Sequence, residues 1–147
     1  MKHEKIATLL AQTKQSIISI QKEALIIDVV KNLSKNNIGV ILVVNQDGSL
    51  DGIVSERDII HAIANRDSVV LGRTVEEIMT GTHKVTTCNT NSYLDDTMRL
   101  MTEGHFRHIP VLENDKVVGI LSLADIVKAR LTEVEDEAAT MRDMISS

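Results

Sequence analysis

The chain has 147 residues, of which 43% are hydrophobic and 25% are charged. This length and composition indicate a folded protein of one domain or two small repeated units, and they exclude a large multidomain enzyme. The net charge of −5 disfavours general nucleic-acid binding, because neutralising a phosphate backbone requires an excess of basic residues.

The first half of the chain predicts a strand, a helix, a hairpin and a second helix. Residues 16–20 form a short strand, and apolar residues recur at helical spacing over 24–35. Two apolar strands, 40–44 and 50–54, flank an Asn-Gln-Asp-Gly turn. The second helix begins at Ser55, a residue type that is common at helix starts.

The second half repeats this order after a structured linker that includes a short helical stretch at 75–79. Pro110 falls within one of its strands, so we expect that strand to lie at a sheet edge or to direct the missing N–H away from the ladder. The expected strands and helices are 84–88, 92–103, 108–112, 117–121 and a helix from Ser122.

Aligning the chain with itself shows that the two halves are copies of one β-α-β-β-α unit. Residues 16–47 align with 84–115 without a gap, and the clearest match places Gly52–Ile59 on Gly119–Ile126. Both segments read G-I-h-S-x-x-D-I, where h is aliphatic. The predicted parts are an N-terminal amphipathic segment, the first repeat, the linker, the second repeat and a C-terminal helical extension, at 1–14, 15–66, 67–81, 82–130 and 131–147.

The shared Ser and Asp of these segments have two interpretations. In Ser55-x-x-Asp58 and Ser122-x-x-Asp125 the serine can cap the following helix, and the acidic residue can favour its positive N-terminus. Capping alone also tolerates other residues at both positions. Because both copies keep Ser and Asp after Gly-Ile, a more specific role is favoured.

With these two segments, the Ile78–Thr80 approach to the second repeat and the Arg107–Val111 run, the chain resembles the paired cystathionine-β-synthase (CBS) domain, or Bateman module. The resemblance extends over about residues 6–130. It implies an α+β (mixed α/β) fold of two repeats packed with pseudo-twofold symmetry, with flanking N- and C-terminal helices. It also implies clefts between the repeats that bind adenosine-containing ligands for a regulatory role.

The chemistry of the repeated segment fits such a ligand. A carboxylate at Asp58 or Asp125 could accept both hydroxyls of a ribose. Ser55 and Ser122 could contact a phosphate or ribose oxygen at a helix N-terminus. The resemblance further suggests that main-chain groups around Ile18-Ser19 and Thr86-Thr87 read the adenine edge. Ile20, Ile53 and Ile120 could form apolar walls or simply belong to the core.

Basic residues differ between the repeats, so we expect two inequivalent sites. The second repeat has His105, Arg107 and His108, where the first has Asn37, Gly39 and Val40. The first repeat instead offers Arg57 within its own segment. Each arginine could serve a phosphate or be a solvated surface charge.

No catalytic motif was found, so we expect neither an enzyme nor a catalytic cofactor. His105 and His108 lack the further ligands of a metal site, and Cys88 aligns with Ile20, which favours a small buried side chain. The lone cysteine, together with the absence of a signal peptide or membrane-spanning run, predicts a cytoplasmic protein without membrane contact.

The sequence therefore predicts a regulatory module that binds AMP, ADP, ATP, NAD or NADH and acts on a separate, unidentified effector protein. We also expect a homodimer, since the terminal amphipathic segments expose thin apolar stripes that could pack on the protein itself or on a second copy. Two alternatives remain at this stage: an interaction protein with empty clefts, and a sensor of S-adenosylmethionine.

Overall fold

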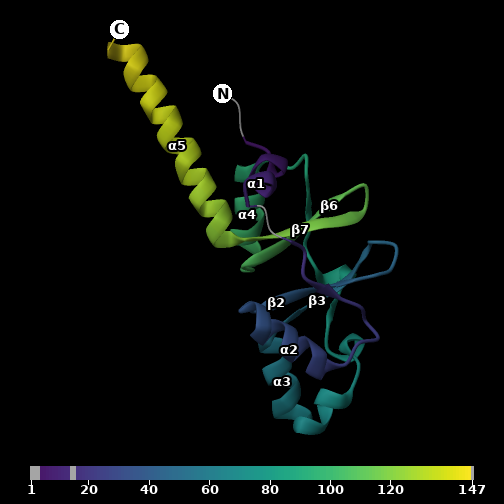
Figure 1. Ribbon diagram of the computed structural model, residues 1–147. Helices are drawn as coiled ribbons and strands as arrows, with labels where there is room; N and C mark the ends of the chain where they lie inside the picture. The colour runs from purple at the N-terminus through teal and green to yellow at the C-terminus, as the bar shows by residue number, and fades with distance from the viewer. Residues whose placement is uncertain (1–3, 14–15, 147) are drawn as a thin grey trace. The chain divides into compact units, whose positions relative to one another are not determined.

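The computed structural model describes residues 4–13 and 16–146, which form two compact units (Figure 1). Unit 2 contains Ile17–Thr86 and Asn114–Val117. Unit 1 contains the N-terminal segment, Thr87–Glu113 and the chain from Val118 onward. Both units combine helices with a mixed sheet, which confirms the predicted fold class.

Unit 2 has a four-stranded sheet in the order β1-β2-β3-β4, with α2 and α3 packed in the same unit. β1 and β2 are parallel, whereas β2–β3 and β3–β4 are antiparallel. The elements are β1 (Ser19–Ile20), α2 (Ile26–Asn36), β2 (Val40–Val44), β3 (Leu50–Ser55), α3 (Glu56–Arg66) and β4 (Thr80–Gly81), with short 3-10 turns at Ser68–Gly72, Val75–Glu77 and Thr82–Lys84.

Unit 1 has a three-stranded sheet in the order β5-β6-β7, in which β5 and β6 are parallel. Its longest element is α5, a single helix of 24 residues. The elements are α1 (Ile6–Thr13), β5 (Cys88–Asn89), α4 (Leu94–Gly104), β6 (His108–Glu113), β7 (Lys116–Ser122) and α5 (Leu123–Ser146).

Corresponding backbone contacts confirm that the chain is an internal repeat. Asn37 and His105, which align, both end a helix in the left-handed conformation, with φ of 52° and 58°. The parallel pairing of Ile20 with Val43 also recurs as Cys88 with Val111. The two halves thus share both sequence and register.

The first strand of each repeat is shorter than predicted, and residues 16–20 are strand only over Ser19–Ile20. Residues 84–88 are strand only from Cys88, because just Cys88 and Asn89 find partners on β6. Pro110 does not lie in an edge strand, since β6 is between β5 and β7. The ladder with β5 begins at Val111, so it requires no N–H from the proline.

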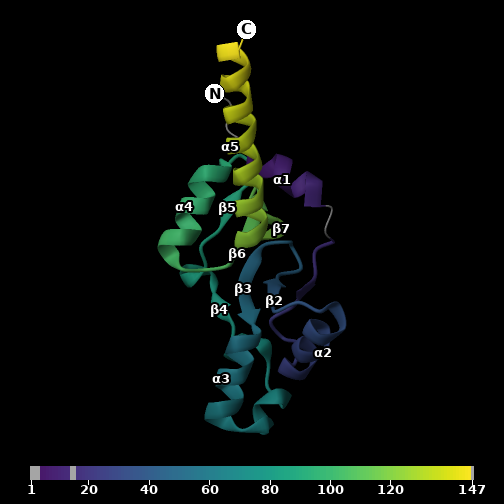
Figure 2. The same cartoon turned by 90° about the vertical axis from the view of Figure 1, so that its left-hand side faces the viewer.

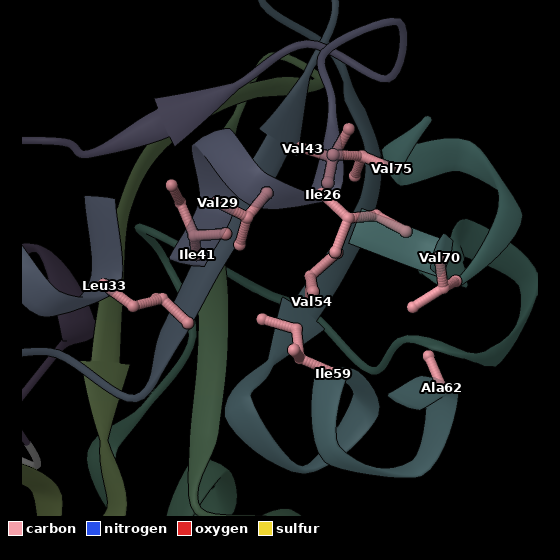
Figure 3. Packing of buried hydrophobic residues seen from close by; sticks show 10 residues of the cluster. All are labelled: Ile26, Val29, Leu33, Ile41, Val43, Val54, Ile59, Ala62, Val70 and Val75. Atoms are coloured by element: carbon pink, nitrogen blue, oxygen red, sulfur yellow. The ribbon is translucent and has the colours of Figure 1, made fainter. Parts of the chain in front are cut away.

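The predicted linker contributes to the hydrophobic core of unit 2. Val70 and Val75 are fully buried and pack in one cluster with residues of α2, β2, β3 and α3 (Figure 3). At the end of the same segment, Gly81 pairs with Gly52 of β3. The segment between the repeats is therefore part of the fold of unit 2.

Residues 4–13 have the corresponding role in unit 1. Leu94 N donates to Glu4 O at 2.9 Å, as Ile26 N donates to Arg73 O at 2.9 Å in unit 2. Ile6 N donates to the carbonyl of Ser92 at 2.8 Å, and its counterpart in unit 2 is the bond from Val75 N to Ala24 O, also 2.8 Å. Each repeat is thus completed by the segment that precedes the other repeat in sequence.

This arrangement explains the glycine that opens both repeated segments. A Cβ on Gly52 would lie 2.5 Å from the carbonyl oxygen of Thr80, and one on Gly119 would lie 2.6 Å from Cδ1 of Leu10. A larger residue at Gly52 would force the backbone of the completing segment away from β3, whereas at Gly119 it would displace the end of the Leu10 side chain. The spacing of glycine and serine that the two copies share therefore combines a close approach of the completing segment with the start of a helix.

Candidate functional site

The first repeated segment forms a complete capping box at the start of α3. Ser55 Oγ accepts a hydrogen bond from Asp58 N at 3.2 Å, and Asp58 Oδ2 accepts one from Ser55 N at 2.9 Å. Both side chains therefore satisfy backbone donors of the helix N-terminus. The capping interpretation is correct for this copy, and one carboxylate oxygen of Asp58 is already engaged.

The second repeated segment forms only half of this arrangement. Ser122 Oγ accepts from Asp125 N at 3.1 Å, which caps α5. In the described part of the chain the Asp125 carboxylate accepts no hydrogen bond, unlike that of Asp58. It is half-buried in the first turn of the helix. Neither oxygen is engaged within the described residues, but Asp125 is not among the residues that line the cavity at this helix start.

Two basic residues lie beside this helix start. Leu123 N donates to Arg107 O at 2.7 Å, which joins the beginning of β6 to the first turn of α5. Partial burial lowers the pKa of His108, the Asp125 carboxylate opposes this effect, and Arg107 lowers the pKa further. Histidine, aspartate and arginine therefore form one electrostatic cluster.

A cavity of about 670 Å³ opens at the same place. Its volume lies within the usual range for small-ligand sites. Three of its residues, Arg107, His108 and Ser122, were predicted from sequence, and Lys128 was not. Helical spacing from Ala124 could have indicated Lys128, because residues four apart share a helix face. The lining is Arg107, His108, Ser122, Leu123, Ala124, Val127, Lys128 and Leu131.

The remaining predicted residues are distributed over both units. Ile18 and Ile20 pack against the core of unit 2, which favours their core-packing alternative. Ser19 and Arg57 are exposed, and Ile53 pairs with Thr80 across the β3–β4 ladder. The other three are half-buried, with Thr86 assigned to unit 2 and Thr87 and Ile120 to unit 1. Their roles in binding stay predictions.

Other reactive groups are placed as follows. Cys88 is buried, which raises the pKa of its thiol to about 12 and disfavours the reactive thiolate. His105 is exposed at the end of α4. Within residues 4–13 and 16–146, no cluster of three or more His, Cys, Asp or Glu side chains could hold a metal ion. Among the helices of the described residues, none is long and apolar enough to cross a membrane.

Comparison with known proteins identifies the family. The model of the CBS domain matches residues 11–65 and again residues 75–132. The chain belongs to the CBS domain family. This CBS pair is 32% identical over 112 residues to a CBS domain-containing protein of Arabidopsis thaliana that is named as mitochondrial. The match covers 75% of this chain and 54% of that relative, so it spans about half of the relative's length.

Solved CBS pairs share the fold. A CBS-domain protein from Agrobacterium tumefaciens is 35% identical, with a TM-score of 0.77 over 86% of this chain and 99% of that one. A protein from Pyrobaculum aerophilum in complex with AMP is 27% identical, with a TM-score of 0.72 over 83% of this chain and 89% of that one.

A third structure, the CBS domain pair of protein MJ0100, holds 5′-methylthioadenosine and S-adenosyl-L-methionine. It is 26% identical, with a TM-score of 0.75 over 90% of this chain and 99% of that one. CBS pairs similar to this one thus bind ligands that contain adenosine, which supports a ligand-binding module.

Proposed function

We propose that this CBS pair is a regulatory module that binds an adenine nucleotide, AMP, ADP, ATP or NAD(H), and reports energy or redox state to a separate effector protein. The observation that carries the proposal is the cavity at the start of α5, where Arg107, Lys128 and Ser122 meet a helix N-terminus. Backbone N–H groups and the helix dipole favour anions there, and the two basic residues add positive charge. This is the chemistry that a phosphate requires.

The ribose and the base have partners of matching chemistry nearby. The Asp125 carboxylate, free of internal hydrogen bonds within the described residues, can accept from both hydroxyls of a ribose. Leu123, Val127 and Leu131 give the cavity an aliphatic side. Since Tyr93 and Phe106 are the only aromatic residues of the chain, a base would pack on such aliphatic groups.

We propose that the first repeat binds ligand more weakly. Its Asp58 is engaged in the capping box, so a ribose hydroxyl would have to compete with the backbone for the same carboxylate. Arg57 is exposed in the first turn of α3, as Arg107 and Lys128 are in the second repeat, so the engaged carboxylate and not the exposure of the basic residues distinguishes the two copies. The two copies of the repeated segment would then differ in affinity or selectivity.

Isothermal titration calorimetry tests the phosphate part of the proposal with AMP and adenosine as the two probes. Arg107→Gln should weaken AMP binding roughly 10-fold or more, the value of a charge-assisted hydrogen bond, and leave adenosine binding unchanged. Arg99→Gln is the matched control, because Arg99 is an exposed arginine of the same unit that pairs with Asp96 on α4. Equal losses for AMP in both variants would refute a phosphate contact at Arg107.

Titrations with ADP, ATP, NAD, NADH and S-adenosylmethionine identify the ligand class. Binding of S-adenosylmethionine with no nucleotide binding would replace the proposal with a sensor of that compound, for which the MJ0100 complex is the precedent. Failure of every ligand to bind would instead favour an interaction protein. A regulatory role further requires that the ligand bind two conformations or assembly states with different affinity.

A further inference from the structure

Helix α5 carries, along most of its length, an apolar stripe that remains exposed in its own unit. Figures 1 and 2 show α5 extending beyond α1 and α4 of the same unit. Ile126 is the only residue of the described helix that is buried. The stripe, which we call the α5 stripe, is exposed at all six positions, from 37% at Val127 to 82% at Ile145. It consists of Val127, Leu131, Val134, Ala138, Met141 and Ile145.

The spacing of the stripe is that of a coiled-coil seam. Its residues are separated alternately by four and three positions, which places Leu131, Ala138 and Ile145 at a and Val127, Val134 and Met141 at d of successive heptads. A helix that rests only on its own domain needs its apolar residues on the face toward the core. Here Ile126 marks that face, and the seam lies about a quarter turn away from it.

We propose that two copies of this chain pair through the α5 stripe as a parallel, in-register coiled coil. The charged residues that flank the stripe are the argument for a second copy. In a parallel pair, the g residue of one helix faces the e residue of the following heptad on the other. Arg130 then faces Glu135 of the second copy, and Glu137 faces its Arg142. Both contacts join opposite charges, and the twofold axis forms each of them twice.

The antiparallel arrangement that overlaps the whole stripe has the opposite electrostatics. It places Glu137 against Glu137 of the second copy, and Glu135 against its Glu135. Lys128 would also face Arg142. Like charges at such flanking positions oppose pairing, so the charge pattern selects the parallel direction.

The first two residues of the α5 stripe adjoin the proposed ligand site. Val127 and Leu131 line the cavity at the start of α5, whereas Ala138, Met141 and Ile145 do not. The pairing does not depend on the proposed function, and variants at positions 137–142 test it without altering the residues that line the cavity. Failure of one proposal is thus distinguishable from failure of the other.

Sedimentation velocity of the full chain at about 1–100 µM tests the pairing with two neighbouring alanines. Ala138 lies in the stripe and Ala139 lies beside it, and both are exposed. Wild type should form dimers, Ala138→Lys should raise the dissociation constant at least about 10-fold, and Ala139→Lys should change it less than about 2-fold. A wild type that stays monomeric, or two variants that behave alike, would overturn the proposal.

Charge reversal tests the direction of the pair. Glu137→Arg and Arg142→Glu should each weaken self-association, because each creates like-charge contacts in a parallel dimer. Mixing the two variants, one carrying an affinity tag, should form the mixed dimer in preference to either homodimer, since both contacts then join opposite charges. Statistical mixing would overturn the parallel arrangement. Residues 137 and 142 do not face each other on one helix, so the preference cannot arise within a chain.

Discussion

Asp58 and Asp125 occupy equivalent positions, yet substituting them should have opposite consequences. In Asp58→Asn the carboxylate that accepts from Ser55 N at 2.9 Å loses its charge, and the first turn of α3 loses a favourable interaction with the helix dipole. Together these effects should cost about 1 kcal/mol of unfolding free energy. Asp125→Asn removes no internal hydrogen bond of the described residues, so its cost should stay within about 0.5 kcal/mol.

For ligand affinity the order of the two substitutions is reversed, and Asp125→Asn should have the larger effect. If Asp125 holds the ribose hydroxyls, Asp125→Asn should weaken nucleotide binding by about 1.5 to 3 kcal/mol, the value of a hydrogen bond to a charged group. Asp58→Asn should leave the stronger site nearly unchanged. The assays are urea unfolding followed by circular dichroism and calorimetric titration with AMP. Asp136→Asn, at an exposed position within α5, is the matched control.

The stability result can contradict the structural reasoning independently of the ligand. An Asp125→Asn variant that is destabilised as much as Asp58→Asn would show that both copies form a full capping box. An Asp125→Asn variant with wild-type stability and wild-type nucleotide affinity would remove this carboxylate from the binding site.

Three further outcomes can be measured on the unliganded protein. Gly52→Ala should destabilise the fold by roughly 2 kcal/mol in urea and by more than Gly119→Ala, because its Cβ would meet the backbone oxygen of Thr80, whereas the other would meet the flexible end of a leucine. His108 has a folded-state pKa below its usual 6.5, so its contribution to stability is complete above that pH and is lost as the pH falls. Wild type should therefore lose more stability than His108→Gln between about pH 7.5 and 5.5, and equal losses would contradict the pKa shift. Cys88, with its thiol pKa raised to about 12, should react with a thiol reagent only after unfolding. Rapid labelling of the folded chain would show that the residue is accessible.

Much of the fold could be predicted from the sequence because the relevant signals are local. The apolar run at 40–44 and the helical spacing over 24–35 correspond closely to β2 and α2. Ser55 and Ser122 were recognised as helix starts from the residues that directly follow them. The repeat itself followed from aligning one half of the chain with the other, and the family model confirms it.

The candidate site was only partly predictable. Arg107, His108 and Ser122 came from the motif and its neighbours, and they lie together on one cavity. Lys128 was missed because it lies outside the repeated segment, on the next turn of α5. The different hydrogen bonding of Asp58 and Asp125 could not be predicted, since identical motifs gave no reason to expect it.

Only the tertiary structure decided which distant parts of the chain are in contact. The sequence does not indicate that residues 4–13 complete the second repeat, or that Val70 and Val75 belong to the core of the first. It also left open whether Pro110 lies in an edge strand, and its strand has neighbours on both sides. The sequence by itself determined helical periodicity and helix capping, because both depend on residues within one or two turns. Strand order and segment exchange depend on which backbones approach closely in space, and that choice is made by the packing of the whole unit.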